Sequence, residues 1–172
     1  MLMAVSILMK LIATPLLLKI GWKDFATQKI ANSDVLLLLA LGLASLFLAA
    51  LAENFWWNLG LSAIAGALLF LLLFPFWLLR KIGAGDVKLL AVAPLVSGGA
   101  DLLIFAIALL VFALITVTIV RNPMLLPSPA FRAYIKHLDH QRVVPFGVPI
   151  SAALLVTIAL QVYGLASRLI LT

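Results

Sequence analysis

Long apolar runs alternate with short polar segments along the whole chain. The runs cover about residues 2–20, 35–52, 58–79, 87–96, 102–120 and 145–169. A run of roughly 20 apolar residues matches the hydrocarbon thickness of a bilayer. The fourth run is shorter than the others and extends at most to Gly98. The pattern predicts an all-α, polytopic integral membrane protein with about six transmembrane helices.

Composition supports this class and excludes a soluble fold. Hydrophobic residues make up 66% of the 172 positions and charged residues only 10%, whereas soluble domains carry about 25% charged residues. No polar stretch is long enough for a separate soluble domain, so we expect residues 1–172 to form a single transmembrane domain. The absence of cysteine excludes disulfides and thiolate zinc sites.

Basic residues gather in alternate connections between the runs. One set of connections holds Lys19, Lys23, Lys29, Arg80, Lys81, Lys88, Arg121, Arg132, Lys136 and Arg142. The opposite set holds Glu53 and Asp101, with Arg168 near the C-terminus as its one basic residue. Because cytoplasmic loops carry the excess of Lys and Arg, we expect both termini outside and the basic loops in the cytoplasm. Topology and contact with anionic membrane lipids thus explain the net charge of +6, and no nucleic-acid partner is expected.

Two further features of the apolar runs need an interpretation. The first run lacks a small-residue cleavage site and is interrupted by Lys10, so we expect a retained span, not a signal peptide. A charge at mid-span is costly; Lys10 either snorkels to the interface or the span begins later. Asp34 and Asp101 each stand at the start of a run and are interpreted as helix N-caps.

Two aspartates are predicted to lie at the cytoplasmic membrane face. Asp24 follows the first run, and Asp86 stands in the stretch KIGAGDVK, residues 81–88, just before the fourth run. Two carboxyl groups close together in a low-dielectric site share a proton, so one acts as an acid and the other as a base. Such a pair suits aspartyl proteolysis, which needs no metal or cofactor. Gly83 and Gly85 would let an extended peptide approach Asp86 and would permit unusual backbone dihedrals.

Each of these residues also has an ordinary structural interpretation. A Gly-Ala-Gly-Asp turn at a helix start is typical of a capping aspartate after a flexible link. Asp24 among lysines is consistent with an interfacial acid.

The motifs in their context resemble the type IV prepilin peptidases, a family of polytopic GxGD aspartyl proteases. The stretch GAGDVKLLA after an apolar run resembles the family's GxGD signature. The stretch DFATQKIAN, residues 24–32, resembles the family's second hallmark, with Ala31 in place of the usual proline. The segment VVPFGVPISAALL resembles the family's C-terminal Pro-aromatic-Gly segment, here Pro145, Phe146 and Gly147. The resemblance extends over nearly the whole chain.

The resemblance implies the GxGD aspartyl protease fold and a set of site residues. Asp24 and Asp86 would be the catalytic pair, without a metal or cofactor. The motif and substrate-binding positions would be Gly83, Gly85, Lys88, Asn32, Pro145, Phe146 and Gly147. Lys88 would orient Asp86 or the substrate, and Ala31 puts the geometry of the turn after Asp24 in doubt.

The resemblance also implies a substrate and a location. The substrate would be a prepilin or pseudopilin precursor, cut at the cytoplasmic face of the bacterial inner membrane to release its basic leader. Larger family members carry a cysteine-rich domain and methylate the new N-terminus. This chain has no cysteine and resembles the compact branch associated with tight-adherence (Flp-type) pili, so we expect proteolysis without methylation. The pilin itself and the oligomeric state stay open.

Other functions and sites remain alternatives. A small transporter or channel would use Asp24 and Asp86 as a proton or cation site, although no inverted repeat is detectable in the sequence. A non-catalytic pilin escort is a second alternative. His137, Asp139 and His140 offer metal ligands, but a solvated amphipathic segment is the preferred interpretation. In the long loop from residue 121 to about 144, the proline-rich stretch RNPMLLPSPA, residues 121–130, is interpreted as a linker, and the loop as a gate for substrate entry is an alternative.

Overall fold

The computed structural model describes residues 2–122, 124, 132–133, 135 and 144–171, and this part of the chain contains helices and no strand. The elements are α1 (Leu2–Thr27), α2 (Asn32–Glu53), α3 (Trp57–Leu78), α4 (Ala84–Ser97), the 3-10 helix η1 (Gly99–Asp101), α5 (Leu102–Arg121) and α7 (Gly147–Leu171). These helices coincide with the six apolar runs, which confirms the predicted all-α membrane fold.

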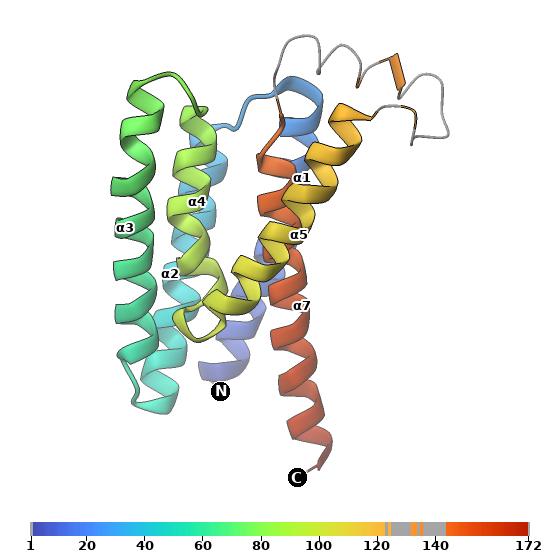
Figure 1. Cartoon of the computed structure of the whole chain (residues 1–172). Helices are drawn as coiled ribbons and strands as arrows, with labels where there is room; N and C mark the ends of the chain where they lie inside the picture. Colours follow the sequence, from blue (N-terminus) through green and yellow to red (C-terminus); the bar gives the residue numbers. More distant parts are fainter. Residues whose placement is uncertain (1, 123, 125–131, 134, 136–143, 172) are drawn as a thin grey trace.

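Five of these helices are long and apolar enough to cross a membrane, and α4 is the exception. Its 14 residues fall short of the roughly 20 that a bilayer core requires. The short α4 is enclosed by protein: it packs against α3, α2 and α7, and in Figure 1 it lies between them. The prediction of a short fourth element is therefore correct, and its backbone avoids lipid because neighbouring helices cover it.

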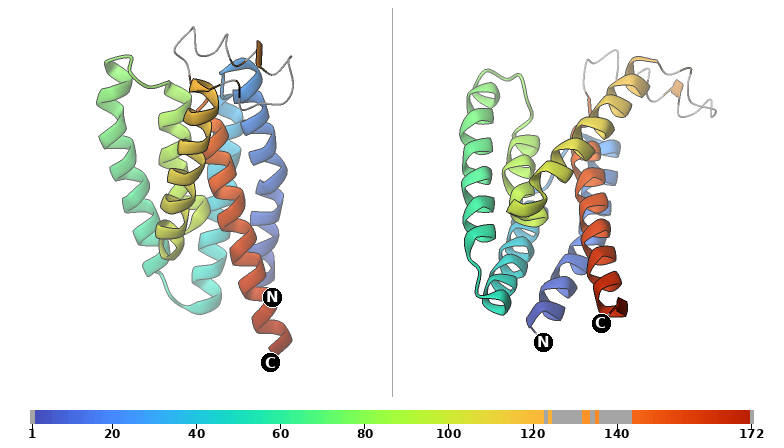
Figure 2. Two further views of the ribbon diagram at one scale, coloured as in Figure 1. Left: turned by 45° about the vertical axis from the view of Figure 1, so that its right-hand side comes forward. Right: turned by 60° about the horizontal axis from the view of Figure 1, so that its bottom comes forward.

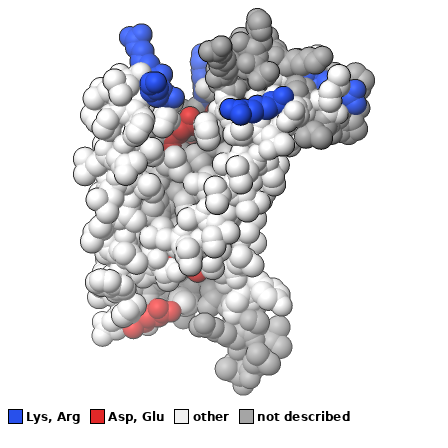
Figure 3. Space-filling model, viewed as in Figure 1, with Lys and Arg blue, Asp and Glu red and all other residues white. Residues whose placement is uncertain are grey.

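The two chain ends lie at one end of the bundle, and most described basic residues lie at the other. Figures 1 and 2 show both termini at the same end of the bundle as the α2–α3 connection, while the α1–α2 and α3–α4 connections lie at the opposite end. Figure 3 shows Lys and Arg gathered at that opposite end and acidic residues near the termini, with further acidic atoms in a hollow between the basic ones. The bundle thus separates the charges as the loop pattern predicts; which side of the membrane each end faces stays a prediction.

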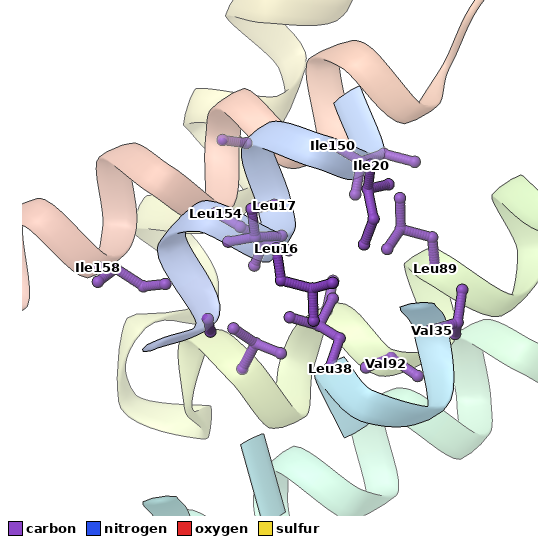
Figure 4. Close-up of a cluster of buried hydrophobic side chains, with 14 of the residues drawn as sticks. Leu16, Leu17, Ile20, Val35, Leu38, Leu89, Val92, Ile150, Leu154 and Ile158 are labelled. Carbon is purple, nitrogen blue, oxygen red and sulfur yellow. The ribbon is translucent and has the colours of Figure 1, made fainter. Parts of the chain in front are cut away.

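The core is built from α1, α2, α4 and α7. Leu17, Leu38, Leu89 and Leu154 are fully buried, and Figure 4 shows these side chains pointing toward one another from the four helices. By contrast, the only fully buried residues of α3 are Ser62 and Gly66. The remaining apolar surface of α3 and most of that of α5 face outward, as lipid-facing helices require.

A polar network ties the membrane-embedded helices together near the terminal end. Lys10 Nζ donates to Gln161 Oε1 at 2.6 Å, and Gln161 Nε2 donates to Asp101 Oδ2 at 2.6 Å. Lys10 therefore has a partner inside the bundle, and helix α1 already begins at Leu2. Lys10 points to a partner in the bundle and does not snorkel, whereas the depth at which the span begins stays a prediction. Because the amide of Gln161 links both charged groups, neither is left without a partner in the membrane.

The structure corrects the predicted N-cap at Asp34 and confirms the position of the one at Asp101. The N-cap of α2 is Ala31, and Asp34 lies inside the helix, where its carboxylate is bound by Lys19 at 2.6 Å. Asp101 does occupy the N-cap position of α5, but its side chain makes no capping hydrogen bond. It accepts from Gln161 instead. Asp34 binds Lys19 and Asp101 binds Gln161, so neither carboxylate caps its own helix by a hydrogen bond.

Glycine packing against α4 leads to a stability prediction. A Cβ atom at Gly66 of α3 would lie 2.5 Å from the Ala91 carbonyl oxygen of α4. We therefore expect Gly66→Ala to lower stability by about 1–3 kcal/mol, as overpacking does. Gly60→Ala in the same helix, where a Cβ meets nothing within 4 Å, should instead stabilise the helix by up to about 1 kcal/mol. Thermal unfolding in detergent compares the two variants, and equal midpoints would contradict the prediction.

Candidate active site

A cavity of about 770 Å³ opens at the basic end of the bundle, between the ends of α1 and α3 and the starts of α4 and α7. Its volume is within the range of typical ligand sites, roughly 300–1,000 Å³. Its lining residues are Asp24, Gln28, Lys29, Ile30, Trp77, Arg80, Lys81, Ile82, Gly83, Ala84, Gly85, Asp86, Val144, Pro145 and Phe146. The structure thus brings both predicted aspartates to one cavity, although 62 positions separate them in sequence.

Asp24 reaches the cavity because α1 continues beyond its apolar run to Thr27. Its carboxylate is buried, with 4% of the residue exposed. Oδ2 accepts a hydrogen bond of 2.7 Å from the backbone N–H of Gly147, and the N–H of Val148 also donates to the carboxylate. The first turn of α7 therefore holds Asp24 in place.

Asp86 lies in the first turn of α4, on the other side of the cavity. The N-cap of α4 is Gly83, so Asp86 is the third helical residue and not the cap. Its carboxylate accepts a hydrogen bond from the N–H of Gly83, as the third residue of a capping box does. The prediction that Asp86 caps the helix is correct, but Asp86 does so from the third helical position and not as the N-cap residue.

The charge state of Asp86 depends on its surroundings. Burial, and then the nearby charge of Asp24, raise the pKa of Asp86 to about 7, while the hydrogen bond from Gly83 acts in the opposite direction. A carboxyl group with this pKa is partly protonated at neutral pH. Asp86 is therefore able to donate a proton near neutral pH, and the charge of Asp24 in the same cavity contributes to this.

The motif glycines are needed for packing. Gly83 has φ −66°, and Gly98 is the one described glycine with positive φ, so the expectation of unusual dihedrals at Gly83 and Gly85 is wrong. A Cβ at Gly83 would lie 3.0 Å from Asp86 Oδ2, and a Cβ at Gly85 would lie 2.9 Å from the Cβ of Ile30. The glycines let the carboxylate fold back and let the turn after α1 approach α4.

Lys88 and Asn32 lie together outside the cavity. Lys88 Nζ donates to Asn32 Oδ1 at 2.9 Å, which joins the start of α4 to the start of α2. Both side chains are exposed, and neither lines the cavity. Their predicted roles toward the substrate stay predictions; the contact that the structure gives them connects two helices.

Two residues of the predicted C-terminal segment line the cavity, and the third contacts Asp24. Pro145 and Phe146 line the cavity, while Gly147 contacts Asp24: a Cβ at Gly147 would lie 2.8 Å from the carboxylate carbon and from Oδ2. His137, Asp139 and His140, the alternative metal ligands, lie outside the described residues, as does most of the loop interpreted as a linker or gate.

Sequence reasoning missed several lining residues. Trp77 lines the cavity, and the predicted site residues do not include it. Its place one helical turn before Lys81, at the start of KIGAGDVK, is the signal that connects it to the motif. Ile30 both lines the cavity and contacts Gly85, and only the tertiary structure reveals this contact.

The turn after Asp24 leads to a second stability prediction. Ala31, which stands where the resemblance has proline, adopts φ −74° and ψ 137°, within the range of proline. Proline would therefore fit this turn, and we expect Ala31→Pro to stabilise the protein by about 0.4–1 kcal/mol. Gln28→Pro is the matched control: Gln28 has φ 54° and its N–H donates to the Asp24 carbonyl at 2.8 Å, so this variant should be destabilised. A lower unfolding midpoint for Ala31→Pro would contradict the expectation.

Comparison with known proteins supports the same region. The sequence model of the type IV leader peptidase family matches residues 11–120, more than half of the chain, and this range includes both Asp24 and Asp86. No curated protein and no solved structure matches the chain.

Proposed function

Because the chain belongs to the type IV leader peptidase family, we propose that it is an aspartyl endopeptidase that removes the basic leader from type IV prepilins or prepilin-like precursors. Family membership gives the general activity, a membrane-embedded leader peptidase. The catalytic pair, the precursor and the site of cleavage are the proposal.

One observation carries the proposal: the carboxyl groups of Asp24 and Asp86 line one cavity at the end of the bundle. The charge of Asp24 contributes to the raised pKa of Asp86, about 7, so Asp86 is about half protonated at pH 7 and mostly protonated one pH unit below. This is the protonation state that aspartyl proteolysis uses. The ionised carboxylate takes a proton from water, and the water oxygen attacks the scissile carbonyl while the protonated partner donates to the carbonyl oxygen.

The position of the cavity fits a membrane-anchored precursor. The apolar helix of a prepilin would lie in the bilayer beside the bundle, and the leader would extend past the basic end. Lys29, Arg80 and Lys81 line the cavity and oppose a basic leader, so we propose that anionic lipid headgroups offset them at this face. We place this face in the cytoplasm and the protein in the bacterial inner membrane, with both termini outside.

We also propose that the protein cleaves without methylating the product, as in the compact tight-adherence branch that the cysteine-free sequence resembles. The test is addition of labelled S-adenosylmethionine to the cleavage reaction. Label on the new N-terminus of the pilin would contradict this part and leave the peptidase proposal standing.

Cleavage in reconstituted liposomes tests the main proposal. The substrate is a prepilin with a basic leader and a glycine before the cut, and mass spectrometry locates the new N-terminus. The parent should cut at the glycine, Asp24→Asn and Asp86→Asn should not, and Glu53→Gln, at the opposite end of the bundle, should cut as the parent does. A parent that cuts none of several such precursors would contradict the proposal. Proton flux in the same liposomes, lost in Asp24→Asn and Asp86→Asn, would then favour a transporter.

A further inference from the structure

The first turn of α7 binds a carboxylate that belongs to another helix. The first N–H groups of any α-helix lack partners within the helix, and α7 has no acidic residue in its own first turn. Asp24 of α1 takes this place, with Oδ2 2.7 Å from the N–H of Gly147 and a second N–H donated by Val148.

The fit between these two helices depends on small residues. Gly147 has no space for a side chain, because a Cβ there would lie 2.8 Å from Asp24 Oδ2. One turn further along α7, Ser151 contacts Gly21 of α1, where a Cβ would lie 3.4 Å from the serine Cβ. The close approach of α1 and α7 brings the carboxylate onto the helix N-terminus.

The two carboxyl groups are therefore held differently. Burial raises the pKa of Asp24, and the hydrogen bonds from the N–H groups of Gly147 and Val148 at the start of α7 act against this rise. Both the hydrogen bonds and the helix dipole stabilise negative charge on Asp24. Asp86 accepts one such bond, from Gly83, at the start of a 14-residue helix. Lys29, Arg80 and Lys81 line the same cavity, and none of them is among the causes of the pKa shifts of Asp24 and Asp86.

We infer that the first turn of α7, entered at Gly147, is a positioning element that favours ionisation of Asp24 over ionisation of Asp86, so that Asp24 is the general base and Asp86 the general acid. This assignment rests on the proposed function. It gives Gly147 a role in orienting Asp24 in place of the substrate contact that the resemblance implies.

The assignment specifies each proton transfer. Asp24 takes a proton from water as the water oxygen bonds to the scissile carbonyl carbon, and Asp86 gives its proton to the carbonyl oxygen. In the collapse of the resulting gem-diol, the C–N bond breaks, Asp24 passes its proton to the leaving nitrogen, and one hydroxyl returns its proton to Asp86. Both carboxyl groups are then restored, and the products are a carboxylic acid and an amine.

The pH dependence of cleavage alone does not test this assignment, since either arrangement requires one proton on the pair. A site-resolved measurement does. The five aspartates are labelled with ¹³C at Cγ in the full chain, and their carboxyl resonances are followed by NMR from pH 4 to pH 9 in detergent micelles. The resonances missing from Asp24→Asn and Asp86→Asn identify the two groups.

We expect the Asp24 resonance to be that of a carboxylate at pH 6, where the Asp86 resonance is that of a protonated acid. The reverse order would overturn the inference. A parent that cleaves prepilin with Asp24 protonated contradicts this inference alone, whereas a parent that cleaves nothing contradicts the proposed function.

The role of α7 is tested with two glycine variants of the same helix. Gly147→Ala should move the titration of Asp24 toward that of Asp86 and slow cleavage by about tenfold or more. Gly164→Ala, where a Cβ meets nothing within 4 Å, should change neither. An Asp24 titration that is the same in Gly147→Ala and in the parent would overturn the role of α7. If Gly147→Ala does not fold, the order of titration in the parent decides.

Discussion

Asp86→Asn is expected to slow prepilin cleavage by about 100- to 10,000-fold, the usual contribution of a general acid or base. Asparagine keeps the size of the side chain and still accepts a hydrogen bond from the N–H of Gly83, but it has no acidic proton to give to the carbonyl oxygen. The initial rate of leader removal in liposomes measures the effect, with Glu53→Gln as the control. A variant that keeps more than a tenth of the parent's rate would contradict the assignment of Asp86 to the catalytic pair.

Loss of activity in this variant should not come from loss of folding. The pKa of Asp86 is raised to about 7 in the folded protein, above the value of roughly 3.9 of an unfolded chain. The contribution of Asp86 to stability is therefore fully present below the unfolded pKa and is lost as the pH rises through about 7. Asparagine has no such titration, so Asp86→Asn should be at least as stable as the parent at pH 8 by thermal unfolding.

The helices could be predicted from the sequence because each is encoded by one local signal. An apolar run of membrane-spanning length specifies a helix wherever it packs, and even the short α4 was recognisable from its run. The two carboxyl groups could be predicted for a related reason. In a chain with 10% charged residues, an acid at the end of an apolar run is conspicuous, and alternating connections place Asp24 and Asp86 at the same end of the bundle.

The sequence could not show which residues that are distant in sequence contact each other. Asp24 and Gly147 are 123 positions apart, and Lys10 and Gln161 are 151 apart. No local pattern encodes such contacts, because they arise when α1 packs against α7. The glycines show the same limit. A glycine suggests conformational freedom when only its neighbours in sequence are known, whereas Gly85 is needed because Ile30 lies against it.

Cleavage should also fall steeply as the pH rises above neutral. The reaction requires one proton on the pair, and Asp86, with a pKa of about 7, is the group that loses it. Above this pH the protonated fraction falls tenfold per unit, so we expect the rate to drop by about 100-fold between pH 6 and pH 9.

The measurement is the initial rate of leader removal across this range, and the control is enzyme returned from pH 9 to pH 6, which should regain its rate if deprotonation is the cause. The residual rate of Asp86→Asn should lack the step near pH 7, because the titrating group is gone. A parent rate that rises through pH 7 and stays level to pH 9 would show that the active pair carries no proton, and the aspartyl mechanism would have to be abandoned.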